Sequence, residues 1–127
     1  MEYNIVYLKE TDSTNLRAKE GAAEGMPDRS LFVAERQSQG RGRLGRRWTS
    51  EDAGNIYMSL LLRPEISPQK ASMLTLVMAL AVAEGLHEAA GADAEIKWPN
   101  DIILNKKKVC GILTEMQADV EKIHHVV

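Results

Sequence analysis

The residues best suited to chemistry form one short run, Gly40 to Trp48, with the sequence GRGRLGRRW. Arg36 lies just before it, so five of the eight arginines fall in one segment of a chain whose net charge is -2. Arginine presents a planar fork of donors that matches phosphate and carboxylate oxygens. Glycine lets the backbone approach a ligand closely, and the tryptophan offers a flat face on which a base can stack. The run therefore predicts a local anion site for a nucleotide or another phosphorylated ligand.

Two other interpretations of this arginine-rich run stay open at this point. Mixtures of Gly and Arg also occur in disordered arms that bind RNA, and such a run can be a solvated loop without a ligand. The sequence pI near 5.9 argues against a dedicated nucleic-acid binder, which is expected to be strongly basic. No specific DNA binding is therefore expected.

Three further polar clusters stand at predicted strand ends or turns, where a rigid scaffold presents functional groups. Ser13 to Asn15 (STN) precedes a helix and is either a cap alone or a cap that also binds a polar ligand group. Lys97 to Asp101 (KWPND) offers a cation, an amide and a carboxylate. Asp101 either holds a magnesium ion beside phosphates or forms an Asx-type turn with a local ion pair. Lys108 precedes an apolar strand and is the member of the Lys106 to Lys108 run best suited to being held in place.

Other familiar site patterns are not found in the sequence. No set of His, Cys and Asp has metal-ligand spacing, and there is neither a Ser-His-Asp set nor a Walker loop. His124 and His125 are adjacent in a predicted strand and therefore point to opposite faces, which favours a structural role. The one cysteine, Cys110, is expected to be a small buried hydrophobe.

Length and composition predict one small soluble domain. The 127 residues are 44% hydrophobic and 27% charged, enough for one domain and too few for two. A single cysteine excludes an internal disulfide and fits a reducing compartment. No signal peptide is recognisable, and the longest apolar run, near Met73 to Ala83, is shorter than the roughly 20 residues that span a bilayer. We therefore expect a cytoplasmic protein that does not associate with a membrane.

Hydrophobic periodicity and turn residues predict strands together with two helices. The expected strands are Tyr3–Leu8, Ser30–Glu35, Asn55–Leu62, Glu95–Trp98, Ile102–Leu104, Val109–Met116 and Ile123–Val127. The expected helices are Leu16–Glu24 and Lys70–Ala90, the second preceded by Ser67 and Pro68 and ended by Gly91. The apolar residues of the second helix cover more than one stripe, which predicts packing on several sides.

These elements predict an α/β or α+β domain in which a mixed sheet packs against one long helix. The last predicted strand reaches Val127, and an unpaired apolar strand needs a partner. We therefore expect the chain to be part of a longer domain. The exposed strand also favours self-association, for example as a homodimer.

The order of the polar clusters resembles that of the biotin protein ligases. The matching residues are Asp12 to Asn15 (DSTN), Gln37, Gly40 to Arg43 (GRGR), Gly45 to Trp48 (GRRW), Lys97 to Asp101 (KWPND) and Lys108 to Leu113 (KVCGIL). The resemblance runs from Glu10 to Met116. The combination of GRGR and KWPND in this order is specific, whereas either motif alone is not.

The resemblance implies a fold and a two-step reaction. The fold is the mixed-sheet α/β domain of biotin and lipoate ligases, distantly related to class II aminoacyl-tRNA synthetases. In the first step biotin carboxylate attacks the α-phosphate of ATP, which is accompanied by Mg²⁺, and gives biotinyl-5′-AMP and pyrophosphate. In the second step a lysine of the biotin carboxyl carrier domain of a biotin-dependent carboxylase attacks the mixed anhydride and becomes biotinylated.

The resemblance also implies residue roles. Adenylation brings two anions together, so cations must screen their repulsion, and Arg41, Arg43 and Lys108 are expected to do so. Contacts with biotin or the adenylate are expected from Ser13, Thr14, Asn15, Gln37, Gly40, Arg41, Gly42, Arg43, Lys108 and Gly111. Contacts with the nucleotide are expected from Arg46, Trp48, Asn100 and Asp101, with Asp101 also expected to bind magnesium. The loop from Gly40 to Arg47 is expected to close over the adenylate.

The extent of the expected domain follows from the same resemblance. We expect residues 1–127 to be the N-terminal part of a biotin protein ligase catalytic domain, without a helix-turn-helix domain and without the C-terminal β-barrel domain. Three alternatives stay open: a lipoate-type ligase on the same fold, an inactive fragment that only binds ligand, and a nucleic-acid-binding module.

Overall fold

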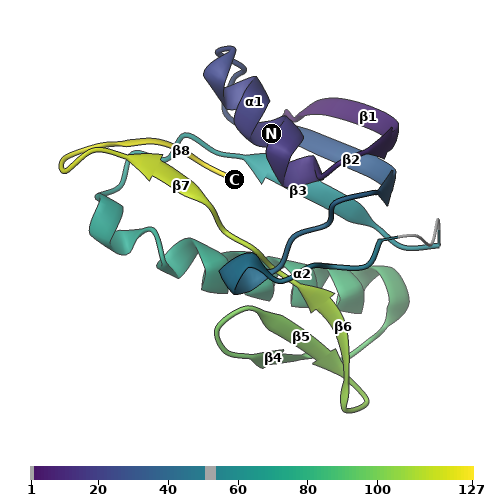
Figure 1. The fold of residues 1–127 in the computed structure, drawn as a ribbon. Coiled ribbons are helices and arrows are strands. Elements are labelled where there is room, and N and C mark those ends of the chain that lie inside the picture. The colour runs from purple at the N-terminus through teal and green to yellow at the C-terminus, as the bar shows by residue number, and fades with distance from the viewer. Residues whose placement is uncertain (1, 51–53) are drawn as a thin grey trace. The chain divides into compact units, whose positions relative to one another are not determined.

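The computed structural model describes residues 2–50 and 54–127 and divides the chain into two compact units. The first unit comprises Met1–Pro68 and Glu115–Val127, and the second comprises Gln69–Thr114. Along the sequence, the second unit is an insertion between two parts of the first. Each unit is described by itself, with the element labels of Figure 1.

The first unit is built on a mixed sheet of three strands. β1 (Asn4–Thr11) runs parallel to β2 (Ser30–Gln37), and β3 (Tyr57–Leu61) is antiparallel to β2. Thr11 lies opposite Gln37, so β1 and β2 end side by side at one edge of the sheet. The two segments that the sequence marked as polar clusters, after β1 and after β2, therefore begin at the same edge.

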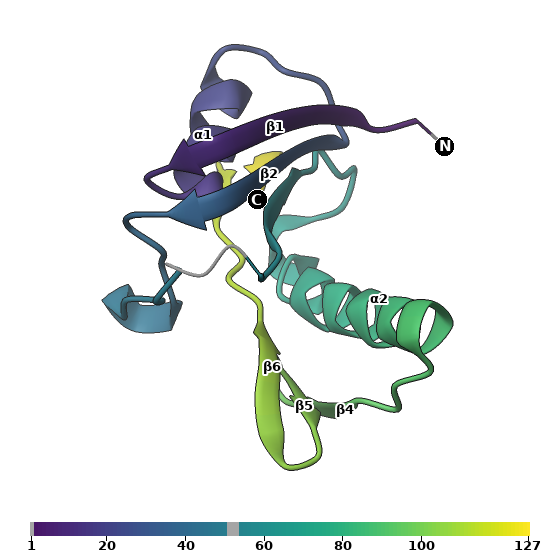
Figure 2. The ribbon, with the colours of Figure 1, turned by 90° about the vertical axis from the view of Figure 1, so that its right-hand side faces the viewer.

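The short helix α1 (Thr14–Ala23) connects β1 to β2 and packs against β2 and β3 (Figure 2). Small residues allow this close approach: Ala18 is fully buried, and a Cβ on Gly21 would lie 2.8 Å from Phe32 Cζ. The core of the unit consists of Ala18, Ala22, Phe32, Leu61 and Val127. Burying a side chain the size of leucine or phenylalanine contributes roughly 1.5–3 kcal/mol, so this small core holds α1 against the sheet.

The end of the chain returns to the first unit as a hairpin. β7 (Met116–Ala118) pairs with β8 (Ile123–Val126) in antiparallel register. Val126 also exchanges two backbone hydrogen bonds of 2.8 Å with Leu62, just beyond β3. The expectation of an unpaired final strand is therefore wrong, because β8 has partners on β7 and at the end of β3.

The second unit begins with the long helix α2 (Met73–Ala90). The predicted start at Lys70 is wrong because a separate 3-10 turn, η2 (Pro68–Lys70), precedes the helix. Gly91 ends the helix as predicted, with a left-handed φ of 64° that glycine adopts without strain.

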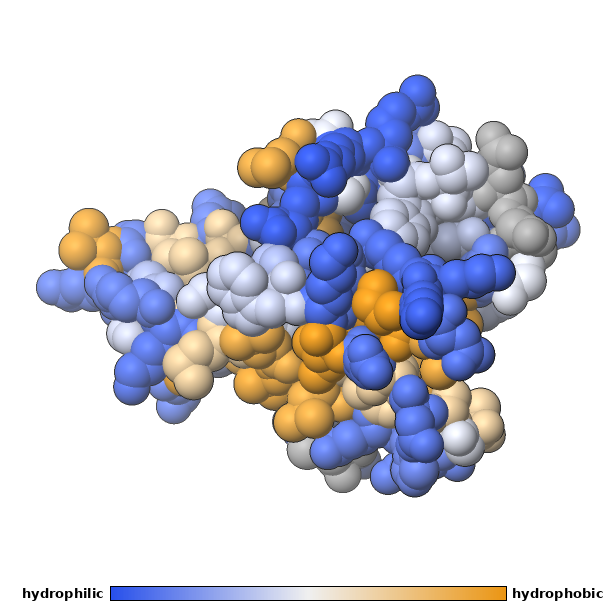
Figure 3. Space-filling view, turned by 90° about the horizontal axis from the view of Figure 1, so that it is seen from below, coloured by the Kyte–Doolittle hydropathy of each residue, from blue (hydrophilic) through white to orange (hydrophobic). Residues whose placement is uncertain are grey.

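Hydrophobic side chains of α2 are largely exposed. Every position of α2 is described, and Ala79 is the one that is buried. By contrast, Met73 and Val77 are each 59% exposed and Leu80 is 53% exposed. The space-filling view shows hydrophobic residues gathered on the face seen from below (Figure 3). The prediction that this helix packs on several sides is therefore wrong for the described chain.

α2 also has the length and hydropathy of a membrane-spanning helix, which the sequence did not predict for any segment. In the described part of the chain it is the one helix long and apolar enough to cross a bilayer, with a mean hydropathy of 1.4 over 18 residues. Core helices of soluble proteins meet the same criterion, so length and composition alone are weak grounds for a membrane assignment.

The rest of the second unit is an antiparallel meander of β4 (Glu95–Lys97), β5 (Asp101–Leu104) and β6 (Lys107–Gly111). Asn105 and Lys106 form the two-residue turn between β5 and β6, with φ of 51° and 65°, as two-residue hairpins require. α2 contacts β4 and β5. The predicted mixed α/β class is confirmed, with the strands divided among three sheets.

Candidate functional site

The start of α1 holds the first polar cluster. The Ser13 side chain accepts a hydrogen bond from the Leu16 N–H at 3.5 Å and so caps the helix, as predicted. Asp12, one residue earlier, accepts bonds from the Ser13 N–H at 2.7 Å and from Arg17 Nη2 at 3.2 Å. Burial opposes ionisation of Asp12, but these bonds and the positive charge of Arg17 hold its pKa below the usual value.

Gln37, at the end of β2, links the helix start to the arginine-rich loop. Its side-chain oxygen accepts bonds from the Thr14 N–H at 2.7 Å and from the Thr14 hydroxyl at 3.0 Å. Its NH₂ group donates to the Ser50 hydroxyl at 3.1 Å, and this hydroxyl donates to the Trp48 carbonyl at 3.2 Å. Because Thr14 and Ser50 are buried, water cannot easily replace these bonds.

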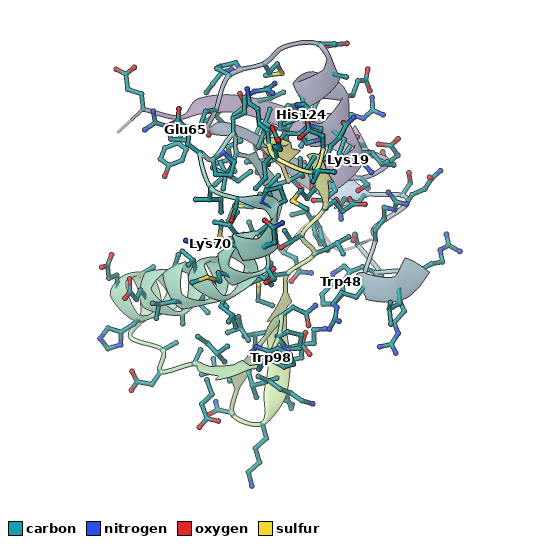
Figure 4. All side chains as sticks on the ribbon, turned by 90° about the vertical axis from the view of Figure 1, so that its left-hand side faces the viewer. Lys19, Trp48, Glu65, Lys70, Trp98 and His124 are labelled. Atoms are coloured by element: carbon teal, nitrogen blue, oxygen red, sulfur yellow. The ribbon has the colours of Figure 1, made fainter. Side chains whose placement is uncertain are left out.

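Gly40 is the point at which the loop closes on itself. Its carbonyl accepts a bond from the Trp48 N–H at 2.8 Å. Trp48 lies where the chain leaves the loop (Figure 4). A Cβ on Gly40 would lie 2.3 Å from the Trp48 carbonyl oxygen and 2.6 Å from Ser50 Oγ. The first glycine of the GRGR motif is therefore required for the close approach of two backbone segments.

The arginines project from a hydrogen-bonded hairpin. Arg41 and Arg47 form an antiparallel bridge, and the Gly42 N–H donates to the Arg46 carbonyl at 2.7 Å. The tip is a short 3-10 turn, η1 (Arg43–Gly45). This ordered frame argues against the interpretation of the segment as a disordered arm.

Glu115, just before β7, gathers one amide and two cations. Its carboxylate accepts bonds from Asn15 Nδ2 at 3.1 Å and Lys19 Nζ at 3.3 Å, and it lies 3.6 Å from Arg41 Nη1. The Asn15 amide oxygen accepts a bond from the Ser59 hydroxyl on β3. Helix start, sheet and arginine-rich loop thus meet around one carboxylate.

Sequence reasoning missed three residues of this arrangement: Ser50, Ser59 and Glu115. Ser59 left a signal, because it alternates with Tyr57 and Leu61 on the buried face of β3, where a polar residue needs a hydrogen-bond partner. Glu115 left none, since its bond to Asn15 spans 100 positions of sequence.

The second unit places its expected site residues on the β5–β6 hairpin. Asp101 lies opposite Gly111, and its carboxylate is 2.8 Å from Lys108 Nζ. The Asn100 side chain donates to the Ile112 carbonyl at 2.9 Å, and the Ile112 N–H donates to the Asn100 carbonyl at 2.9 Å. Asp101 is therefore ion-paired across the hairpin rather than within the KWPND motif, and the Asn100 side chain bonds to Ile112 rather than in an Asx-type turn.

The surroundings of Asp101 bear on the expected magnesium contact. In residues 2–50 and 54–127, no three side chains of His, Cys, Asp or Glu are grouped as ligands. The Asp101 Oδ1 atom lies within ion-pair range of Lys108, although without hydrogen-bond geometry. Magnesium in nucleotide sites takes one or two carboxylates plus phosphate oxygens. One carboxylate beside the phosphates of ATP would satisfy that requirement, so magnesium binding by Asp101 stays a prediction.

The remaining titratable candidates have structural surroundings. His124 is exposed and His125 is buried, which confirms that they point to opposite faces of β8. Burial, together with the positive charges of Arg63 and Lys19, lowers the pKa of His125. Cys110 is half-buried rather than buried, and its burial raises the pKa of the thiol.

The two units thus divide the predicted site residues into two sets. The first unit holds Ser13, Thr14, Asn15, Gln37, Gly40, Arg41, Gly42, Arg43, Arg46 and Trp48, with Arg43 and Arg46 exposed near the loop tip. The second unit holds Asn100, Asp101, Lys108 and Gly111. Within each unit, hydrogen bonds or ion pairs connect most members of the set.

Known proteins resemble this chain over nearly all of its length. The chain is 46% identical over 127 residues to the bifunctional ligase/repressor BirA of Bacillus subtilis, which covers 100% of this chain and 39% of that protein. The biotin protein ligase of Aquifex aeolicus in complex with biotin and ATP matches with a TM-score of 0.74 and 36% identity, over 97% of this chain and 50% of that chain. The Leishmania major enzyme in complex with biotinyl-5-AMP matches with a TM-score of 0.76 and 29% identity, over 99% of this chain and 56% of that chain.

These similarities extend to a whole family. The chain spans 39% of the length of the Bacillus subtilis relative. A profile of the "Biotin/lipoate A/B protein ligase family" matches residues 7–127, which include both the arginine-rich loop and the β5–β6 hairpin. The chain therefore belongs to the biotin/lipoate A/B protein ligase family.

Proposed function

We propose that this chain is part of a biotin protein ligase that activates biotin with ATP and transfers it to a lysine of a biotin carboxyl carrier domain. The observation that carries the proposal is the anchored arginine-rich loop. Its base is joined to the start of α1 through Gln37, Ser50 and Thr14. Arginines on such a frame can meet two anionic substrates without a large loss of conformational entropy on binding.

The first step joins biotin to AMP. A biotin carboxylate oxygen attacks the α-phosphorus of ATP, the bond from that phosphorus to the bridging oxygen breaks, and pyrophosphate leaves with the bond's electron pair. Both reactants are anions, so the step needs fixed positive charge near the α-phosphate. We assign this role to Arg41, Arg43 and Lys108.

The second step transfers the biotinyl group. The uncharged amine of the carrier lysine attacks the acyl carbon of biotinyl-5′-AMP, and AMP leaves as the amide forms and the amine loses a proton. Until the carrier arrives, the mixed anhydride must be kept from water. We assign this protection to closure of the loop from Gly40 to Arg47 over the adenylate.

Recognition is assigned to the rest of the two sets. Contacts with biotin or its adenylate are proposed for Ser13, Thr14, Asn15, Gln37, Gly40, Gly42 and Gly111. Arg46 and Trp48 are proposed to contact the nucleotide, together with Asn100 and Asp101. Thr14 and Gln37 already hydrogen-bond to each other. These two residues therefore shape the site more than they offer free donors to a ligand. Magnesium enters the proposal as the ion that accompanies ATP.

Isothermal calorimetry with biotin, then with biotin plus Mg-ATP and a pyrophosphate assay, tests the proposal. Tight biotin binding with stoichiometric pyrophosphate release is the expected result. Preference for lipoate over biotin in a competition would replace the substrate, and binding without pyrophosphate release would limit this chain to ligand binding. No binding of either acid by folded chain would overturn the proposal for these residues.

A further inference from the structure

The backbone of Glu115 is held in place by two hydrogen bonds. Its N–H donates to the Val127 carbonyl and the Val127 N–H donates to its carbonyl, each at 2.8 Å. β7 begins at the next residue and pairs with β8. The Cα of Glu115 is therefore fixed by the C-terminal hairpin, and its carboxylate reaches the site from a defined point.

The carboxylate is the shared partner of three groups from two segments. Asn15 and Lys19 come from α1, and Arg41 comes from the loop. The Glu115 side chain is 25% exposed and that of Arg41 is 44% exposed, so water screens their attraction only in part. The loop arginine is thereby tied to the same carboxylate that holds the helix start.

Glu115 also decides which way the Asn15 amide points. An ionised carboxylate can only accept hydrogen bonds. The Asn15 group that faces Glu115 must therefore be the NH₂, so that its oxygen faces the Ser59 hydroxyl. A neutral residue at position 115 would remove this constraint, because an amide presents either a donor or an acceptor.

We propose that Glu115 is a positioning residue of the ligase reaction, which fixes Arg41 and the Asn15 amide in the geometry that receives the biotin carboxylate and its adenylate. The ligand in this inference rests on the proposed function, whereas the contacts of Glu115 do not depend on it. On binding, Arg41 exchanges part of its interaction with Glu115 for the anionic ligand. Glu115 keeps the arginine near that position beforehand.

Hydrogen exchange of the ligand-free chain tests the contacts without reference to any ligand. Glu115→Gln should speed amide exchange in residues 40–48 roughly three- to tenfold, with amides of β1 and β2 unchanged as an internal reference. Glu121→Gln is the matched control, because Glu121 is an exposed glutamate of the same hairpin. Equal exchange in residues 40–48 of Glu115→Gln and the unmodified chain would overturn the inference.

Biotin affinity adds a second readout. Glu115→Gln should weaken biotin binding roughly three- to tenfold. Adding Glu115→Gln to Arg41→Ala should weaken binding by a smaller factor than it does in the unmodified chain, as expected if Glu115 acts in part through Arg41. Fully additive losses would overturn that route of action. If the unmodified chain binds no biotin, the proposed function fails, and the exchange measurement by itself decides whether Glu115 holds the loop.

Discussion

The two sets of candidate residues are built in different ways. In the first unit, Gln37 joins Thr14 to Ser50, and Glu115 joins Asn15 to Arg41, so each contact closes a long stretch of chain. In the second unit, Asp101 and Lys108 form an ion pair between the two strands of one hairpin. The first arrangement depends on tertiary structure, whereas the second needs only a correct two-residue turn.

This difference predicts how each set responds to mutation. Removing one member of a connected, buried network leaves its partners unsatisfied, which costs more than the bond itself contributes. Removing one member of a half-exposed ion pair leaves a group that water can solvate. The chain has one tryptophan in each unit, Trp48 and Trp98, so fluorescence of Trp98→Phe and Trp48→Phe backgrounds can follow the two units separately.

The largest effect is expected from Gly40→Ala. The added Cβ would lie 2.3 Å from a backbone carbonyl oxygen, and relieving this overlap should cost about 3 kcal/mol in the loop. Calorimetry should show biotin binding weakened by about 100-fold. Gly85→Ala in α2 is the control, because a Cβ there meets nothing within 4 Å and binding should not change. Unchanged affinity of Gly40→Ala would show that the loop base is not part of the site.

A smaller effect is expected from Gln37→Leu, compared with Asn100→Leu. Gln37→Leu removes three side-chain hydrogen bonds and leaves the N–H of buried Thr14 without its acceptor, which should lower the free energy of unfolding by about 2 kcal/mol. Asn100→Leu removes one side-chain bond and should cost about 1 kcal/mol. Urea denaturation of the two variants checks the ranking. Equal losses would contradict the distinction between the two units.

The pH dependence of the first unit should depend on His125. Its pKa is lowered in the fold, so the unfolded chain takes up a proton first as the pH falls below about 6.5. The free energy of unfolding should therefore decrease between pH 7.5 and 5.5, and this slope should become shallower in His125→Gln. The exposed neighbour supplies the control, His124→Gln. An identical slope in His125→Gln and the unmodified chain would show that another group is responsible.

The smallest effect on stability is expected from Lys108→Gln. The ion pair with Asp101 involves a side chain that is 40% exposed, so its loss should change the free energy of unfolding by less than about 1 kcal/mol. Pyrophosphate release should nevertheless fall steeply if Lys108 has the role proposed for it. A large loss of stability would mean that the second unit depends on this pair as the first unit depends on Gln37.

Local features of the fold were predictable from the sequence, and contacts over long distances were not. Ser13 as a cap, Gly91 as a helix end and the hairpin between β5 and β6 follow from residue types and spacing. The exposed face of α2 and the partners of β8 depend on tertiary packing that periodicity does not encode.

The same holds for the candidate site. The GRGR and KWPND motifs marked the segments concerned, but neither motif indicated that Gly40 packs against Trp48 and Ser50. Glu115 could not be found at all, because its partners lie on α1 and the loop. Which of the marked residues contact a ligand remains a prediction.

The order of the segments has a consequence for synthesis of the protein. Val127 belongs to the core formed with Ala18, Phe32 and Leu61, and Glu115 precedes the hairpin that carries it. Chains emerge from the ribosome N-terminus first and fold by domains. The whole of the inserted second unit is therefore translated before the core of the first unit can be completed. In nascent chains that do not yet include β8, the sheet lacks part of its hydrophobic core.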